Sequence, residues 1–270
     1  SKEDISNVSC YDPSAGSGTL LMNLAYQIGQ DKCSIYSQDI SQKSSNLLRL
    51  NLILNNLVHS IHNIIQGNTL TQPAHKDRKS NLQKFDFIVS NPPFKLDFSD
   101  FRDDLDSEVN SQRFFAGIPK IPAKKKETMA IYLMFLQHVI FSLKAEGKAA
   151  IVVPSGFITA KSGIAHKLLK KLIQDQILSG VISMPSNIFA KTGTNVSVLF
   201  IDKTNKERVV LIDASKMGEE IKEANSQKTY LTQEEIEKII HVFTSKESID
   251  QFSAVVSYED LIQKNFTLNA

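Results

Sequence analysis

The regular alternation of short apolar runs with helical patterns most constrains what this chain can fold into. Strands are predicted near residues 8–11, 34–38, 61–65 and 85–89. Helices are predicted between them, one near residues 43–57, where leucines recur at helical spacing: Leu47, Leu50, Leu54 and Leu57. This order is typical of a sheet wrapped by crossover helices. The sequence therefore predicts an α/β fold, and 270 residues are enough to bury a substantial core.

The pattern continues to about residue 205 and then changes. A helix near residues 128–143 precedes the buried strand "KAAIVVP", and two strands, "GVISMP" and "VSVLFID", follow an amphipathic helix. We expect a core at residues 1–205 and an extension of the same domain at residues 206–270. The extension is predicted to hold an edge strand, "VVLID", and short helices, one with a capping box from Thr232 to Glu235.

Composition excludes some classes of function. The net charge of +2 neither demands nor excludes a nucleic-acid partner. Cys10 and Cys33 form no metal spacing and no disulfide framework, and the six histidines show no ligand spacing, so we predict no metal site and a reducing, cytoplasmic setting. The longest apolar segment is interrupted by Gln137 and His138 and is too short for a membrane span.

A glycine loop, "YDPSAGSGTLL", follows the first predicted strand. Gly16 and Gly18 allow a tight turn and close approach of a ligand, but Leu21 replaces the third glycine of a dinucleotide fingerprint. Asp12 would repel a pyrophosphate; it suits an ammonium group, or holds the loop through its amides. Asp39 follows Gly18 by about twenty residues, the interval of an acid that binds ribose hydroxyls. A cationic nucleoside such as S-adenosylmethionine fits this pattern; the alternative is that the glycines serve only the turn and Asp39 caps the next helix.

The stretch "FDFIVSNPPF" ends the fourth predicted strand beside that loop. The prolines hold Asn91 extended, so that its side-chain oxygen and the neighbouring carbonyls face the cleft as acceptors for an exocyclic amino group. Phe94 offers a face on which a base can stack, an interaction worth about 1–3 kcal/mol. The alternative is that its ring is buried under the following loop.

The signals after this stretch are weaker. The loop from Lys95 to Lys126 begins acidic and ends basic, and long loops are usually functional or disordered. Its lysines are candidates for DNA phosphate contacts or simply form a solvated face: Lys120, Lys124, Lys125 and Lys126. Ser155 lacks the flanking glycines of a nucleophile elbow and is interpreted as part of a turn.

"DPSAGSGTLL" followed by "SNPPF" resembles the motif pair of amino-directed S-adenosylmethionine methyltransferases, in the order of the gamma group of adenine methyltransferases. Further segments are similar to the catalytic domain of the modification subunit of type I restriction–modification systems: "YSQDISQKSSNLLRLNLILNNL", "GNTL", "LMFLQHVIFSLKAEGKAAIVVPSGFI", "VISMPSNIFAKTGTNVSVLFIDK" and "FSAVVSYEDLIQKNFTLN". The resemblance implies a Rossmann-like three-layer sandwich with a mostly parallel seven-stranded sheet whose last strand is antiparallel.

The resemblance also implies an activity: transfer of a methyl group from S-adenosylmethionine to N6 of an adenine flipped out of double-stranded DNA. It implies a DNA-specificity subunit as partner and leaves open a restriction (nuclease/translocase) subunit. The alternatives are methylation of an RNA guanine or a protein glutamine, or a non-catalytic scaffold. Asn68 departs from the aspartate that relatives often carry to contact the cofactor's adenine amino group, but it retains an amide oxygen as acceptor.

Each role then falls on named residues. The implied catalytic residues are Asn91, Pro92, Pro93 and Phe94. The implied cofactor-binding residues are Asp12, Pro13, Ala15, Gly16, Ser17, Gly18, Thr19, Asp39, Ile40, Asn68 and Thr69.

Overall fold

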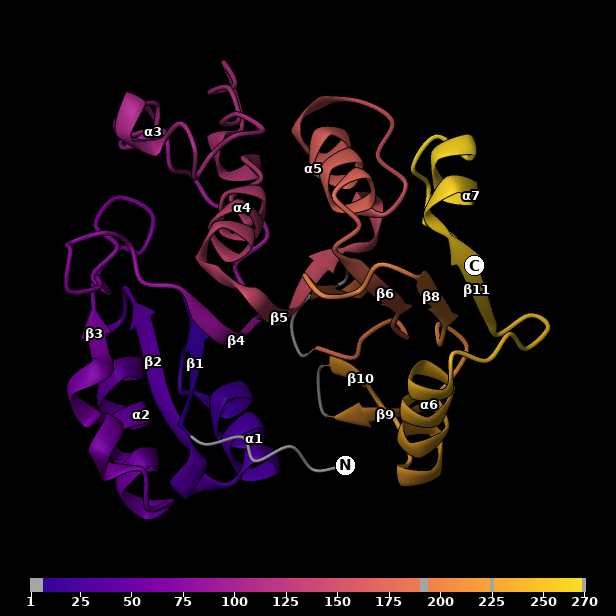
Figure 1. Cartoon of the computed structure of the whole chain (residues 1–270), viewed down its shortest axis with the longest axis horizontal. Coiled ribbons are helices and arrows are strands. Elements are labelled where there is room, and N and C mark those ends of the chain that lie inside the picture. Colours follow the sequence, from indigo (N-terminus) through magenta and orange to yellow (C-terminus); the bar gives the residue numbers. More distant parts are fainter. Residues whose placement is uncertain (1–6, 190–193, 224–225, 269–270) are drawn as a thin grey trace. The chain divides into compact units, whose positions relative to one another are not determined.

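Five parallel strands form the sheet of the first of two units, residues 1–151 and 152–270, into which the chain divides (Figure 1). The computed structural model describes residues 7–189, 194–223 and 226–268. In the first unit the strand order is β5-β4-β1-β2-β3, and every neighbouring pair is parallel. The strands are β1 (Val8–Asp12), β2 (Cys33–Asp39), β3 (Ile64–Gln66), β4 (Phe85–Ser90) and β5 (Leu143–Pro154), whose last residues belong to the second unit.

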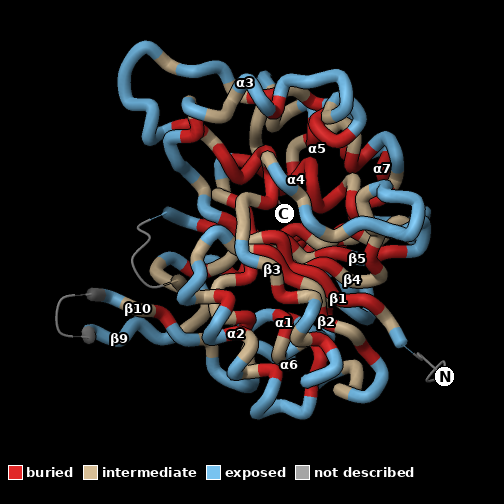
Figure 2. Tube along the Cα trace, turned by 90° about the vertical axis from the view of Figure 1, so that its left-hand side faces the viewer, coloured by how far each residue is buried: buried red, intermediate tan, exposed pale blue. Residues whose placement is uncertain are grey.

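Helices cover both faces of this sheet. They are α1 (Thr19–Ile28), α2 (Gln42–Leu54), α3 (Arg102–Leu105) and α4 (Tyr132–Ser142), with 3-10 turns at Gln30–Lys32, Val58–Asn63, Glu108–Asn110 and Lys126–Thr128. Neighbouring residues of a strand point to opposite faces. On β1, Cys10 packs in a cluster with α1 and α2, whereas the Tyr11 hydroxyl lies 3.1 Å from Nε2 of His138 on α4. The strands run as a buried layer between the helices (Figures 1 and 2). This arrangement confirms the α/β class.

The segment between β4 and α4, residues 95–131, is ordered and has an apolar core of its own. Phe98, Leu105 and Phe114 are buried and pack in one cluster with Met134 and Phe135 of α4. Gln137 of α4 ties the segment down further, because it accepts a hydrogen bond from the Ala116 amide and donates one to the Gly117 carbonyl. We call residues 95–131 the β4–α4 segment.

The second unit contains a mixed sheet and a separate hairpin. The sheet order is β11-β8-β6-β7; β6 pairs with β8 in parallel and with β7 antiparallel, and β11 pairs antiparallel with β8. The expectation of seven strands with only the last one antiparallel was therefore wrong, because β8 and β11 follow β7 in the chain and add two strands. Its elements are α5 (Gly163–Gln174), β6 (Leu178–Ser183), β7 (Val196–Asp202), β8 (Arg208–Asp213), α6 (Gln233–Ser245), β11 (Ser253–Ser257) and α7 (Tyr258–Gln263), with a 3-10 turn at Ser155–Phe157. The hairpin pairs β9 (Glu219–Glu223) with β10 (Ser226–Tyr230).

Two predictions about the elements of this unit have clear outcomes. The capping box from Thr232 to Glu235 is present at the start of α6. The strand "VVLID" is β8, but it is not an edge strand, because β11 pairs with it on the side away from β6. The boundary predicted at residue 205 falls inside the second unit and remains a prediction. None of the helices in the described ranges is long and apolar enough to cross a membrane.

Candidate active site

The carboxyl ends of four neighbouring strands bring most of the predicted site residues to one edge of the first unit's sheet. Asp12 ends β1, Asp39 ends β2, Gly67 to Thr69 follow β3, and Asn91 follows β4. Because these strands are parallel, their carboxyl ends meet at the same edge, where ligands of open α/β sheets bind.

The two glycines of the loop after β1 have different roles. Both have positive φ angles, 53° at Gly16 and 83° at Gly18. A Cβ built on Gly18 would lie 2.1 Å from Cδ1 of Leu48, so this glycine lets α1 pack against α2. A Cβ on Gly16 would meet nothing within 4 Å. Gly16 therefore borders open space, where a ligand can approach the backbone.

Asp39 supports this loop directly. Its Oδ2 accepts a hydrogen bond from the Gly16 amide at 2.8 Å, and its Oδ1 accepts one from the Ser41 amide at 2.8 Å. The side-chain cap of α2 is Ser41, whose hydroxyl accepts from the Ser44 amide. Helix capping therefore does not account for Asp39. Each carboxylate oxygen retains a second lone pair for a ligand hydroxyl.

Asp12 is almost completely buried beneath the loop. Its Oδ1 accepts a hydrogen bond from the Ser14 amide at 2.9 Å, and the Ser14 hydroxyl lies 2.9 Å from that of Ser90 at the end of β4. Burial, and to a smaller extent the charge of nearby Asp39, raises the pKa of the Asp12 carboxyl to about 7. A group with this pKa changes charge near neutral pH, and a cation beside it would favour its ionised form.

The turn after β3 is held by its own side chains. Oδ1 of Asn68 accepts hydrogen bonds from the Leu70 and Thr71 amides at 3.0 and 3.3 Å. The Thr69 hydroxyl donates to the Pro13 carbonyl at 2.6 Å and so joins this turn to the glycine loop. The Asn68 oxygen, predicted as an acceptor for the cofactor's adenine, therefore already accepts two backbone amides.

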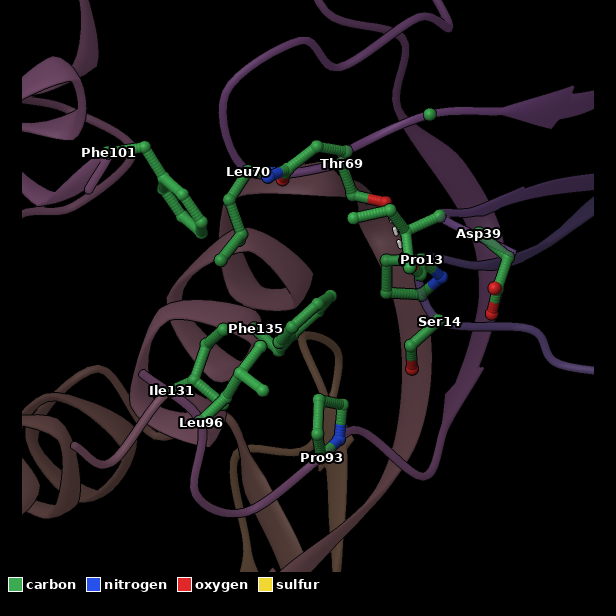
Figure 3. A pocket seen from close by; sticks show the side chains of 13 residues that line it. Pro13, Ser14, Asp39, Thr69, Leu70, Pro93, Leu96, Phe101, Ile131 and Phe135 are labelled. Atoms are coloured by element: carbon green, nitrogen blue, oxygen red, sulfur yellow. Dashed lines mark hydrogen bonds between the residues drawn. The ribbon is translucent and has the colours of Figure 1, made fainter. Parts of the chain in front are cut away.

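A pocket connects these strand ends (Figure 3). Its volume is about 520 Å³, including the space open to solvent. The lining residues are Pro13, Ser14, Asp39, Ile40, Gly67, Asn68, Thr69, Leu70, Pro93, Leu96, Phe101, Ile131 and Phe135. The side chains of Leu70, Leu96, Phe101, Ile131 and Phe135 form one wall, and Asp39 and Ser14 lie on the opposite side (Figure 3). An apolar wall suits a flat base, and a carboxylate suits ribose hydroxyls, so the residues fit the nucleoside part of S-adenosylmethionine.

The Asn91–Phe94 motif lies at the end of β4, beside the pocket. The Asn91 side chain is exposed and makes no hydrogen bond within the described residues, whereas Pro92 is buried and Pro93 lines the pocket. Phe94 is half-buried. Its ring packs edge-to-face with the ring of Tyr132 on α4; the ring centroids lie 6.3 Å apart and the ring planes are at 78°. The Asn91 side-chain oxygen is therefore available to accept a hydrogen bond from a ligand, and the nearby Phe94 ring is held by its packing against Tyr132.

The family follows from the comparisons with known proteins. The model of the N-6 DNA methylase family matches residues 2–270. The chain belongs to the N-6 DNA methylase family. The type I restriction enzyme MpnII methylase subunit of Mycoplasma pneumoniae is 32% identical over 267 residues, which cover 96% of this chain and 47% of that subunit. The chain thus spans about half the length of this curated relative.

Solved structures agree in fold. The crystal structure of a type I restriction-modification methyltransferase subunit from Streptococcus thermophilus is 27% identical, with a TM-score of 0.79 over 99% of this chain and 54% of that one. A structure from Listeria monocytogenes described as a class I S-adenosylmethionine-dependent methyltransferase is 15% identical, with a TM-score of 0.56 over 89% of this chain and 65% of that one. The second likeness concerns the fold alone, and the predicted methyltransferase fold is confirmed.

Some of the predicted site residues line this pocket of the N-6 DNA methylase chain. Of the predicted cofactor residues, five line it: Pro13, Asp39, Ile40, Asn68 and Thr69. The others do not line it: Asp12 ends β1, Thr19 begins α1, and Ala15, Gly16, Ser17 and Gly18 lie in the loop between them. The whole apolar wall was missed, including Leu96 and Phe101 from the β4–α4 segment. The only signal for these was their apolar character within an otherwise polar loop.

The predicted DNA-contacting lysines of this N-6 DNA methylase lie on the same segment. All four are exposed: Lys120, Lys124, Lys125 and Lys126. Their role, like those of the individual site residues, remains a prediction.

Proposed function

We propose that this chain is the catalytic region of a DNA adenine methyltransferase. It transfers a methyl group from S-adenosylmethionine to N6 of an adenine that has left the duplex, as the modification subunit of a cytoplasmic type I restriction–modification complex. In that complex a DNA-specificity subunit reads the sequence, and a restriction subunit is a further partner. Membership of the N-6 DNA methylase family and similarity to type I methylase subunits support this proposal.

The observation that carries the proposal is the position of Asn91. Its amide is exposed and unbonded at the end of β4, and Pro93, two residues later, lines the same pocket as Asp39 and Asn68. If the nucleoside part of the cofactor binds along Asp39 and Asn68, its methyl group would lie near Asn91, whose side-chain oxygen can accept a hydrogen bond from the amino group of the base. Holding two reactants in this way supplies about 7–11 kcal/mol of a barrier.

The protein's own groups prepare the base. An adenine amino group is a poor nucleophile because its lone pair is delocalised into the ring. Asn91 Oδ1 and the Pro92 carbonyl accept hydrogen bonds from its two N–H groups and localise the lone pair on nitrogen. As the new N–C bond forms and the S–C bond of the donor breaks, the nitrogen loses one proton, which passes to solvent. The ring of Phe94, supported by Tyr132, stacks on the base and offsets the few kcal/mol that flipping costs. S-adenosylmethionine supplies the methyl group already activated on a sulfonium, so the chain needs no nucleophile of its own.

The test is to identify the methylated product. The full-length protein with its specificity subunit is incubated with labelled S-adenosylmethionine and duplex DNA, and the DNA is digested to nucleosides. We expect the label in N6-methyladenine. Label in RNA guanine or protein glutamine, or cofactor binding without transfer, would contradict the proposal and favour one of the alternatives.

Asn91→Ala separates chemistry from binding. We expect transfer to fall by about 10²–10³-fold, the range for loss of one preorganised polar contact to the reacting group, with cofactor affinity unchanged. Asn23→Ala is a matched control, because Asn23 is exposed on α1, away from the strand ends. Loss of cofactor binding in Asn91→Ala would show that Asn91 does not have the catalytic role.

A further inference from the structure

Arg113, in the β4–α4 segment, is buried without a counter-charge. Its side chain is 1% exposed, and its guanidinium lies 4.2 Å from the centre of the Phe114 ring. Nη2 donates a hydrogen bond to the Leu70 carbonyl, while Nε and Nη1 have no partner and no carboxylate pairs with the guanidinium among the described residues. Burial lowers the pKa of Arg113 to about 10, so the group is still charged at neutral pH.

Stability alone does not account for an arginine at this position. Burying a cation and leaving two donors unsatisfied opposes folding, and an apolar side chain of similar length would fill the space without that cost. The one polar bond that Arg113 makes, to Leu70, is therefore the feature that needs a functional explanation.

Leu70 belongs to the turn that lines the pocket after β3. The Leu70 amide donates to Asn68 Oδ1, and Thr69 donates to the Pro13 carbonyl of the glycine loop. The first bond holds the turn itself, and the second joins the turn to the glycine loop. Arg113 adds a bond to the Leu70 carbonyl from a position 43 residues further along the chain. Leu96 and Phe101 of the same segment complete the apolar wall opposite Asp39 (Figure 3).

We propose that Arg113 is a positioning residue that holds the Asn68–Leu70 turn in the geometry required for cofactor binding. This inference rests on the proposed function, because it assigns the pocket to S-adenosylmethionine. The coupling runs through one contact: the bond from Arg113 to the Leu70 carbonyl ties the turn, and with it cofactor affinity, to this position of the β4–α4 segment.

Arg113→Met in the full-length protein tests the proposal. Methionine fills a similar volume without a charge or a donor. We expect hydrogen exchange at the Leu70 and Thr71 amides of the cofactor-free protein to accelerate about tenfold. We also expect the Kd for S-adenosylmethionine to rise at least about fivefold, the lower end of typical coupling between sites. The melting temperature should stay the same or rise, because the buried charge is gone. A merely structural role would lower both stability and affinity.

Two further variants sharpen the result. Arg113→Lys keeps a buried charge but shortens its reach, and should raise Kd in the same way. Gln137→Leu is the control, because it releases Ala116 and Gly117 of the same segment without touching the turn. We expect Gln137→Leu to leave Kd unchanged.

Unchanged exchange in Arg113→Met, or an equal rise in Kd for Gln137→Leu, would overturn the proposal. A wild-type protein that binds no S-adenosylmethionine would instead overturn the proposed function. The exchange rates would then decide by themselves whether Arg113 holds the turn.

Discussion

At Asn68 both lone pairs of the side-chain oxygen are used within the turn, by the Leu70 and Thr71 amides. Only the NH₂ group remains for a ligand, and it cannot accept a hydrogen bond from an adenine amino group. An aspartate could keep both backbone bonds with one oxygen and offer the other to the cofactor. The identity of this residue should therefore change affinity without changing the fold.

We predict that Asn68→Asp lowers the Kd for S-adenosylmethionine by about tenfold or more, since a hydrogen bond to a charged group is worth about 1.5–3 kcal/mol. Isothermal titration calorimetry on the full-length protein measures this. Gln72→Glu is the control for added negative charge, because Gln72 is exposed close to the same turn. An Asn68→Asp protein with unchanged affinity would show that the adenine amino group does not lie at this residue.

Asp12 gives a prediction about pH. The pKa of its carboxyl in the fold, about 7, is above the ordinary value of 3.8, so between these values the native state binds a proton that the unfolded chain has already lost. The contribution of this carboxyl to stability is therefore greatest below about pH 4 and is lost as pH rises through 7. Each tenfold difference in proton affinity between the folded and unfolded states corresponds to about 1.4 kcal/mol.

We therefore predict that Asp12→Asn gains stability relative to the wild type as pH rises from 5 to 8. Denaturant unfolding at several pH values measures the difference. We also expect wild-type affinity for S-adenosylmethionine to increase over this range, because the cation favours ionised Asp12, and this increase should disappear in Asp12→Asn. A constant stability difference between the two proteins would contradict the prediction.

At the scale of elements, the two glycines of the loop between β1 and α1 have different roles: Gly18 allows helix packing, and Gly16 allows a ligand to approach the backbone. Gly18→Ala places a methyl group against Leu48 and adds left-handed strain, for an expected loss of about 2–5 kcal/mol. Gly16→Ala carries only the strain, about 1–2 kcal/mol, but its methyl group enters the open space. We expect Gly18→Ala to fold poorly and Gly16→Ala to fold but bind cofactor weakly. Thermal unfolding and calorimetry distinguish them, and normal cofactor binding by Gly16→Ala would exclude close approach at this residue.

The elements also show what sequence could and could not predict. The strand ends that carry Asp12, Asp39 and Asn91 were predictable, because the apolar runs and the residues after them are local signals. On α2 the leucine spacing predicted a helix, but the side chains of Leu47, Leu50 and Leu54 are exposed and the buried face is the adjacent one, with Leu48 and Leu52. Two apolar stripes satisfy the same periodicity, and only tertiary packing decides between them.

The β4–α4 segment was harder to predict, because its order depends on distant contacts. Its regular pieces, such as α3 and the turn at Lys126–Thr128, span only three or four residues and carry weak local signals. Phe98 and Leu105 are buried through packing with residues of α4, and Arg113 reaches back to Leu70. A single sequence carries no periodicity that reveals such pairings, so the apolar wall of the pocket emerged only from the structure.

At the scale of the whole molecule, the candidate site lies within the first unit. All residues that line the pocket precede residue 151, and the four segment lysines lie in the same unit. The segment that supplies part of the pocket wall is therefore also the one that carries the predicted phosphate contacts.

The lysines can be tested without disturbing the pocket. We predict that replacing Lys120, Lys124, Lys125 and Lys126 by alanine weakens DNA binding and reduces the slope of log K against log salt by up to about 3.6, since each phosphate contact contributes about 0.9. Methyl transfer at saturating DNA should be unchanged, because these side chains do not line the pocket. Fluorescence anisotropy of the complete complex at several salt concentrations measures the slope. The matched control replaces four exposed lysines elsewhere: Lys32, Lys43, Lys79 and Lys264. An equal slope in the two variants would assign these lysines to a solvated face instead of the DNA interface.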